Sequence, residues 1–445
     1  MDSTTFTNQN TRVKEEFSVD KITNLGGASV VIDYIKDRLS LPQLLSEHLA
    51  VEKAPWSTYS MSDVAMTLIC GYTLGIERIS HFAEYEQDPL LTLKLGLPKL
   101  PDHTVLYKDL EKFDTQDKVD SINEVNKRIL PHLVESEVIL DIDSTVETLY
   151  GKQEKGEKGY NPKKHGRPSY RPALAFDGRS HACIKAWLRG GKSNMSSDFI
   201  KLYKECEAQL PAGSKIKYVR VDCEVGGEDN YAFLEEAKVG YVIKLKWNPG
   251  LQKRMELGVL WKRLLSDEDE IIEIGSIWYR AEKWKKARRV VIIRRRPCEE
   301  PAQKVLFKDY LWEYEFIVTD RVWDEEDIWH FYNQRCSAEN YIKEGKYGFF
   351  IDHIPSDDFH ANYADLLLKM LAYNCYLGFQ KEIVPVGYRR FTVRTMRRLF
   401  FWIPGVVVRH ARQWVVKLWK GFPRKEAWWY MRARLASLTG SMVPS

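Results

Sequence analysis

Residues 324–346 read DEEDIWHFYNQRCSAENYIKEGK, a pattern typical of one amphipathic helix with an unusual polar face. The first residue is a good N-cap, and the three acidic residues after it place negative charge where the helix dipole favours it. Four polar residues follow at steps of three, four and seven: Tyr332, Arg335, Glu339 and Lys346. At about 100° per residue, these side chains fall within an arc of roughly 60°. The face suits either a metal-binding acid beside a phosphate backbone or an ordinary solvated surface.

The length and composition of the chain predict a folded protein of several domains. Its 445 residues suggest two or three domains, with 44% hydrophobic and 12% aromatic residues. The net charge of +5 does not identify a partner. Seven widely spaced cysteines without a C-x-x-C pair suggest neither a zinc ribbon nor a disulfide framework, and fit reduced thiols in a cytoplasmic setting. The polar N-terminus is unlike a secretory signal, and because no run approaches 18 apolar residues we expect no membrane span.

Changes in hydrophobic periodicity divide the chain into six segments. We expect a flexible tail at 1–20, a helical domain at 21–134, the first part of an α/β core at 135–248, a β-rich insertion at 249–320, the second part of the core at 321–385, and a basic helical region at 386–445. The short helices of the N-terminal domain fit a helix-turn-helix and a plain bundle equally well.

From Glu137 onward, the period of two predicts a buried strand with Asp141 and Asp143 on one face. The order that follows is two further strands, a helix, a strand ending at Asp222, a helix and a strand. This order predicts an α/β domain with a mixed sheet. Carboxylates on strands this apolar are costly to bury unless they are paired or bound to a cation. Either Asp141 or Asp143 could be a ligand; we favour Asp143 because it lies at the strand end, where sites gather in such sheets.

Lys and Arg are concentrated in three places. The first cluster follows the first strand: Lys163, Lys164 and Arg167. The second lies in the insertion: Lys283, Lys285, Lys286, Arg288, Arg289, Arg294 and Arg296. The third is the stretch 389–434, where basic residues alternate with tryptophan and phenylalanine. One cluster alone is often a charged strand edge or a solvated loop, but three beside aromatics favour a nucleic-acid partner.

These features resemble the DDE transposases. The order is an Asp ending a strand (LDIDST), a second Asp in VRVDCEVGG and a Glu on a late helix. The spacing of Tyr332, Arg335, Glu339 and Lys346 fits the Y-(2)-R-(3)-E-(6)-K signature of the insertion-sequence-4-like superfamily. The segments LDIDST, GYNP–HGR–Y–P, FIVTD and YNQR–AEN–IKE look like the transposases of the 1380 group. The resemblance covers about residues 25–435, with Cys223 replacing a more usual small residue.

The resemblance implies a ribonuclease-H-like catalytic core in which Asp143, Asp222 and Glu339 are the metal ligands. Two Mg²⁺ ions would be bound, with Mn²⁺ as a substitute. The implied activity is that of a cut-and-paste DNA transposase, which acts on the terminal inverted repeats of its own bacterial element and joins the cleaved ends to target DNA. The resemblance also implies a homodimer in the DNA complex. Tyr332, Arg335 and Lys346 would then contact phosphates near the cut. The two Lys and Arg clusters in the core and insertion would contribute further DNA contacts through Lys163, Lys164, Arg167, Lys285, Lys286, Arg288 and Arg289.

The residues alone support the same chemistry, since Mg²⁺ prefers oxygen ligands and no His or Cys constellation competes for the role. Two other functions remain open on the sequence: a catalytically inactive DNA-binding descendant, and a structure-specific nuclease of the same fold. The three acids argue against the first, and joining of DNA ends would exclude the second.

Overall fold

The computed structural model describes residues 19–162, 164–264, 270–298 and 312–440. The N-terminal helical domain begins with a short strand and continues through six α-helices: β1 (Ile22–Thr23), α1 (Ser29–Asp33), α2 (Leu41–His48), α3 (Met61–Leu74), α4 (Pro89–Leu95), α5 (His103–Leu110) and α6 (Gln116–Ile129). Helix α3 is buried along almost its whole length, so it is not a solvent-facing recognition helix. The expected tail at 1–20 lies almost entirely outside the described residues.

The core and the insertion follow, with three short strands between the first two predicted strands and a helix at the start of the insertion that the sequence does not predict. The core elements are β2 (Glu137–Ser144), β3 (Glu147–Thr148), β4 (Glu157–Lys158), β5 (Pro168–Tyr170), β6 (Ala173–Asp177), β7 (Cys183–Trp187), α7 (Met195–Gln209), β8 (Lys215–Val221), α8 (Glu228–Glu236) and β9 (Gly240–Lys244). The insertion holds α9 (Pro249–Glu256), β10 (Lys262–Arg263), β11 (Glu270–Tyr279), β12 (Arg288–Pro297) and β13 (Glu313–Thr319).

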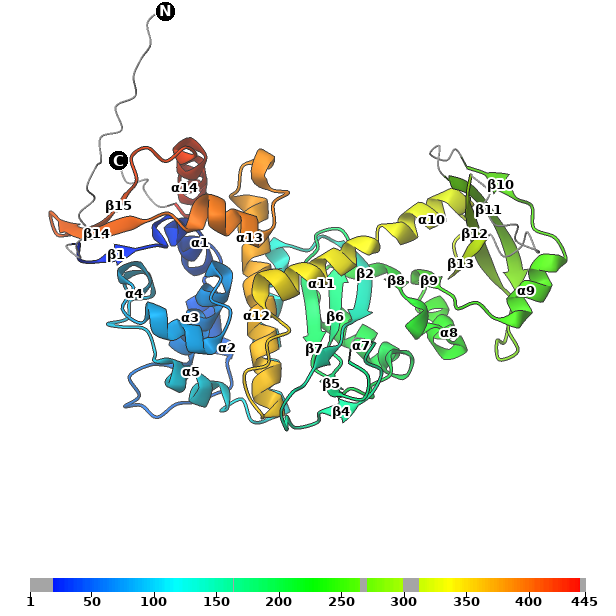
Figure 1. The fold of residues 1–445 in the computed structure, drawn as a ribbon, viewed down its shortest axis with the longest axis horizontal. Helices are drawn as coiled ribbons and strands as arrows, with labels where there is room; N and C mark the ends of the chain where they lie inside the picture. Colours follow the sequence, from blue (N-terminus) through cyan, green and yellow to red (C-terminus); the bar gives the residue numbers. More distant parts are fainter. Residues whose placement is uncertain (1–18, 163, 265–269, 299–311, 441–445) are drawn as a thin grey trace, which may run out of the picture.

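A nine-stranded sheet runs through both of these segments in the order β10-β11-β12-β13-β9-β8-β2-β6-β7 (Figure 1). Strands β2, β8 and β9 are parallel, whereas β6 and β7 are antiparallel to their neighbours. The mixed sheet of the core is therefore confirmed. The insertion is not a separate sheet, because Ile317, Val318 and Thr319 of β13 pair with β9.

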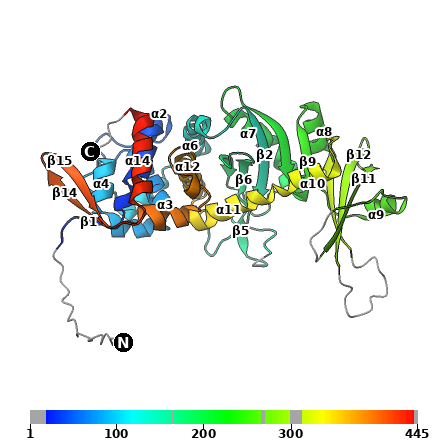
Figure 2. The same ribbon diagram turned by 90° about the horizontal axis from the view of Figure 1, so that it is seen from above.

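The expected single helix at 324–346 is two helices, α10 (Glu325–Asn333) and α11 (Cys336–Phe349). The break falls at Gln334 and Arg335, where the Arg335 N–H bonds to the carbonyl of Tyr332 rather than to that of Phe331. The two helices still follow one another almost in line, from the insertion to the helical domain (Figures 1 and 2). The predicted continuous helix is wrong at this junction, where Nη1 of Arg220 on β8 donates to the Phe331 carbonyl at 2.9 Å.

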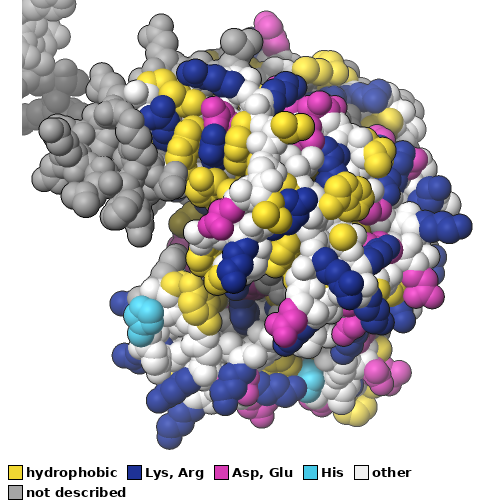
Figure 3. Space-filling model, turned by 90° about the vertical axis from the view of Figure 1, so that its right-hand side faces the viewer, with side chains coloured by type: hydrophobic (Ala, Val, Ile, Leu, Met, Phe, Trp, Pro, Cys, Tyr) yellow, Lys and Arg dark blue, Asp and Glu magenta, His cyan; other side chains and the backbone are white. Residues whose placement is uncertain are grey.

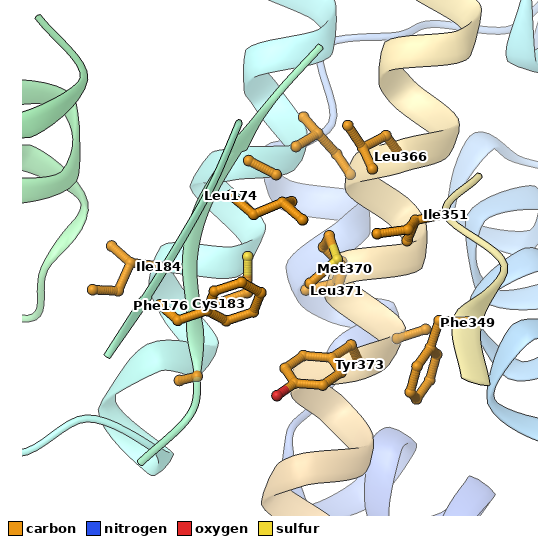
Figure 4. Packing of buried hydrophobic residues seen from close by; sticks show 14 of the residues in the cluster. Leu174, Phe176, Cys183, Ile184, Phe349, Ile351, Leu366, Met370, Leu371 and Tyr373 are labelled. Carbon is orange, nitrogen blue, oxygen red and sulfur yellow. The ribbon is translucent and has the colours of Figure 1, made fainter. Parts of the chain in front are cut away.

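Helix α12 (Phe359–Glu382) is buried along most of its length and joins the helical domain to the sheet. Figure 4 shows Met370 and Tyr373 between Phe176 and Cys183 of the sheet and Phe349 at the end of α11. Nδ2 of Asn374 donates to Asn126 at 2.7 Å and to the carbonyl of edge strand β7 at Cys183 at 2.8 Å. In the described ranges, no helix is both long and apolar enough to cross a bilayer.

The C-terminal region 386–445 is not wholly helical, and the prediction is wrong there. Between α13 (Val393–Met396) and α14 (Lys425–Thr439) lies a hairpin of β14 (Gly405–His410) and β15 (Gln413–Leu418). Strand β1 pairs with β14, so the two ends of the described chain share a small three-stranded sheet. The hairpin projects at the left of Figure 1.

Candidate active site

Two parallel strands bring the first two candidate acids to one edge of the sheet. Asp141 on β2 is in register with Arg220 on β8, and Ile142 with Val221. Asp143 lies two residues after Asp141, and Asp222 lies two residues after Arg220. Because side chains on a strand alternate between the two faces, Asp143 and Asp222 lie side by side on the same face of the sheet. Each carboxylate accepts the N–H of the next residue, at 2.8 Å for Asp143 and 2.6 Å for Asp222.

Asp141 is bound on both of its carboxylate oxygens. Nε of Arg220 donates to Oδ1 at 2.8 Å, and Nη2 donates to Oδ2 at 2.7 Å. Both side chains are about 1% exposed. Burial raises the pKa of Asp141 and Arg220 acts in the opposite direction. The bidentate pair leaves Asp141 poorly placed to bind a cation, which favours Asp143 as the first ligand.

Arg335 lies against Asp143. Its Nη2 is 3.2 Å from Oδ2 of Asp143, an ion pair without hydrogen-bond geometry. The residue is 6% exposed, and its Nε and Nη2 have no hydrogen-bond partner among the described residues. Burial opposes the charge, but Asp143 raises the pKa of Arg335, with smaller contributions from Tyr332 and Asp222. A buried, under-bonded guanidinium at this place is ready to bind an anion.

The electrostatics of Asp143 link the three candidate acids. Burial raises the pKa of Asp143, while Arg335 and the Ser144 N–H lower it. Asp222 and Glu339 both add to the rise. The charges of Asp222, at the end of β8, and Glu339, on α11, therefore both act on Asp143, at the end of β2. Asp143 and Asp222 are both half-buried, whereas Glu339 is exposed.

The other residues of the helix signature have different environments. Tyr332 is buried in a small cluster with Val242 and Ile317 of the sheet, and burial raises the pKa of its hydroxyl. Lys346 is half-buried near the end of α11. It faces Glu147, whose fully buried carboxylate has its pKa raised to about 8 by burial while Lys346 acts in the opposite direction.

A tighter group of potential ligands lies elsewhere. In the portion of the chain that the structure describes, the one group of three such residues with ligand atoms within 4.8 Å of one another is Glu86, Asp102 and His103. Asp102 caps α5 by accepting hydrogen bonds from the backbone and hydroxyl of Thr104, and these lower its pKa to about 2. Asp102 is therefore accounted for as the N-cap of α5. The ligand atoms of Asp143, Asp222 and Glu339 do not all lie within 4.8 Å of one another.

The residues of the predicted basic clusters differ in their exposure to solvent. Lys163 lies outside the described residues, whereas Lys164 and Arg167 are exposed, as are Lys285 and Lys286. On the insertion side, Lys and Arg are mixed with Asp and Glu over the surface (Figure 3).

Two of the predicted DNA contacts are bound internally instead. Arg288 is 3% exposed and pairs with Glu228 and Glu235. Arg289 pairs with Glu325 and donates to the carbonyl of Trp323. Both guanidinium groups therefore stabilise the insertion through internal ion pairs. The prediction that Arg288 and Arg289 contact DNA phosphates is wrong for this reason.

Sequence reasoning missed Arg220. The signal was present, because Arg220 precedes Asp222 by two residues just as Asp141 precedes Asp143. On parallel neighbouring strands, this equal spacing predicts that Asp141 lies opposite Arg220, two residues before Asp143 and Asp222.

Comparisons with known proteins place the chain in a family. Among solved structures, the chain is similar to the cryo-EM structure of the piggyBac transposase synaptic complex with hairpin DNA. The TM-score is 0.43 and the identity 11%, over 95% of this chain and 87% of that one. This similarity is too low to carry an argument about the fold. A search of curated proteins found no match. The family model described as transposase DDE domain group 1 matches residues 6–440. The chain therefore belongs to the transposase DDE domain family, group 1.

Proposed function

We propose that the protein is a cut-and-paste DNA transposase that binds the terminal inverted repeats of its element, cleaves at the ends and joins the 3′-OH ends to target DNA. The observation that carries this proposal is the electrostatic link of Asp143 to both Asp222 and Glu339, beside the buried Arg335. Acids from two other segments act on Asp143, and the guanidinium beside it would bind a phosphate of the DNA.

We take β7, β6, β2, β8 and β9 as a ribonuclease-H-like core. The support is their order, in which two antiparallel strands flank three parallel ones, with helices α7 and α8 in the crossovers. Asp143 and Asp222 would then occupy the carboxyl ends of the central strands, where sites gather in α/β sheets.

The residues present fit divalent cations. Asp143, Asp222 and Glu339 offer only oxygen atoms, the ligands that Mg²⁺ and Mn²⁺ prefer. Burial and two neighbouring acids raise the pKa of Asp143, and a bound cation would remove that penalty. We propose that these three residues hold two Mg²⁺ ions, which would activate the attacking oxygen and neutralise charge on the leaving oxygen.

The protein's own groups would place the DNA at this site. Arg335 would donate its free N–H groups to phosphate oxygens of the transposon end, and Lys346 would add a second positive charge. Water would be the first nucleophile, freeing a 3′-OH, and that hydroxyl would then attack target DNA. One site can serve both steps because only the nucleophile changes. Two ends must be held together, so we expect a homodimer in the DNA complex.

An assay with labelled end DNA tests this function. The full chain should cleave a duplex carrying the inverted repeat in Mg²⁺ or Mn²⁺, and should join a pre-cut end to a plasmid. EDTA should abolish both reactions. DNA binding without cleavage in either metal would favour an inactive DNA-binding descendant, and cleavage without joining would favour a nuclease.

The C-terminal hairpin is predicted to contact DNA through its charge. Residues 405–425 contain no Asp or Glu and six basic residues: Arg409, Arg412, Lys417, Lys420, Arg424 and Lys425. Exposed Trp414 lies below Lys21 and Arg409 at 5.1 and 5.9 Å. A two-stranded ribbon of this kind fits the major groove.

The hairpin variant Arg409→Ala/Arg412→Ala should weaken DNA binding and lower the slope of log K against log salt by about 2, since each phosphate contact contributes about 0.9. The matched control is Lys201→Ala/Lys204→Ala, which removes two exposed charges from α7. Fluorescence anisotropy at several salt concentrations measures both slopes. Equal slopes for the two variants would show that the hairpin does not contact DNA.

A further inference from the structure

Arg220 contacts more than its ion-pair partner. Its Nη1 donates to the carbonyl of Phe331 at 2.9 Å and approaches Oε1 of Gln334 at 3.4 Å. The guanidinium also lies 4.8 Å from the centre of the Phe331 ring. A single side chain on β8 therefore joins Asp141 on β2 to the last turn of α10.

The bond to Phe331 coincides with the break between α10 and α11. In a continuous helix, the Phe331 carbonyl would accept the N–H of Arg335. Here that N–H goes to Tyr332 at 2.8 Å, so Arg220 supplies the donor that the Phe331 carbonyl would otherwise lack. The break directly precedes the turn of α11 that carries Glu339. The placement of that acid thus depends on the junction that Arg220 binds.

The pair is enclosed. Arg220 is fully buried, and a Cβ at Gly178 would lie 2.2 Å from its Nη2 and 2.7 Å from Oδ2 of Asp141. Only a residue without a side chain fits there, so the pair has little room to take another geometry. Its positions on β2 and β8 lie two residues behind Asp143 and Asp222, on the same face.

We propose that Arg220 and Asp141 are positioning residues: their ion pair fixes the α10–α11 junction and thereby sets Glu339 and Arg335 beside Asp143 and Asp222. The part that concerns metal binding rests on the proposed function. The part that concerns the junction does not. Asp141 orients Arg220, Arg220 binds the Phe331 carbonyl, and that bond holds the break where the helix leaves the insertion.

The test replaces the pair by apolar residues, in Asp141→Leu/Arg220→Met. A buried ion pair exchanged as a whole for hydrophobic side chains often keeps the stability of the fold. The double variant should therefore stay folded while losing the bond to the Phe331 carbonyl and the weaker contacts with Gln334 and the Phe331 ring. Arg220→Lys is the second variant, because lysine keeps the charge beside Asp141 but cannot reach both carboxylate oxygens and the Phe331 carbonyl.

Hydrogen–deuterium exchange of the full chain without DNA gives a readout independent of activity. In both variants, amides of residues 331–339 should exchange at least tenfold faster than in the parent, with α12 unchanged. The control Glu137→Leu/Lys217→Met removes another ion pair between β2 and β8, with Nζ–Oε distances of 2.8 and 2.9 Å, that does not reach the break. It should leave exchange at 331–339 unchanged.

Metal and activity measurements complete the test. The Mn²⁺ concentration for half-maximal cleavage should rise at least tenfold in the folded double variant, and kcat should fall while KM for the end DNA stays the same. Parent-like exchange at 331–339 in a folded variant would overturn the positioning role. A parent that neither binds Mn²⁺ nor cleaves would instead refute the proposed function and leave the exchange result to decide the junction.

Discussion

Replacing Asp143 by asparagine is expected to reduce DNA cleavage on the order of 10³-fold while DNA binding remains. Asparagine keeps the shape of the side chain and removes the negative charge that would hold a cation at the end of β2. Loss of several kcal/mol of metal-assisted stabilisation corresponds to about three powers of ten in rate. Asp222→Asn and Glu339→Gln should behave in the same way, because the three acids act as a unit and their losses do not add.

The matched control is Asp229→Asn, an exposed acid seven residues after Asp222. It should cleave like the parent. Single-turnover cleavage of labelled end DNA measures the rates, and anisotropy confirms that each variant still binds. Cleavage by the Asp143 variant within threefold of the parent would show that this carboxylate is not a ligand.

Replacing Arg397 by methionine is expected to lower the free energy of unfolding by about 3–5 kcal/mol. Arg397 is 2% exposed and donates to three carbonyls: Thr73 at 2.9 Å, Tyr72 at 2.6 Å and Gly348 at 2.6 Å. Burial lowers its pKa to about 10, with Tyr376 and Glu344 acting against that change. The side chain joins the end of α3 to the end of α11, so its loss strands buried carbonyls in both the helical domain and the core.

The neighbouring Arg398→Met is the control, because Arg398 is exposed and its replacement should change stability by less than about 0.5 kcal/mol. Urea unfolding followed by fluorescence compares the midpoints of the two variants. A similar small shift in both would mean that the buried guanidinium contributes little to joining α3 and α11.

The strands of the core were predictable because their alternation is strong. VILDIDS became β2 and KIKYVRV became β8, with Asp143 and Asp222 where the apolar runs end. The break at Gln334 was not predictable from the helix itself, since the donor that binds the Phe331 carbonyl comes from β8, far away in the sequence. The internal pairing of Arg288 was also hidden, because a basic run in sequence does not reveal the acids of α8 that fold against it.

The C-terminal hairpin escaped prediction for a local reason. Its two-residue turn is Ala411–Arg412, with φ values of 47° and 65°. Such turns usually carry Asn or Gly, and without them the alternation of VVVRH and QWVVKL gives no clear hairpin signal. The basic and aromatic composition of the region was visible, whereas its strand geometry was not.

A crystal of the protein soaked in Mn²⁺ tests the central claim most directly, through an anomalous difference map. The account predicts density bound by Asp143 together with Asp222 or Glu339, and a shift of the Arg335 guanidinium away from Oδ2 of Asp143. Density at Glu86, Asp102 and His103 alone, with Arg335 still against Asp143 at saturating Mn²⁺, would contradict it.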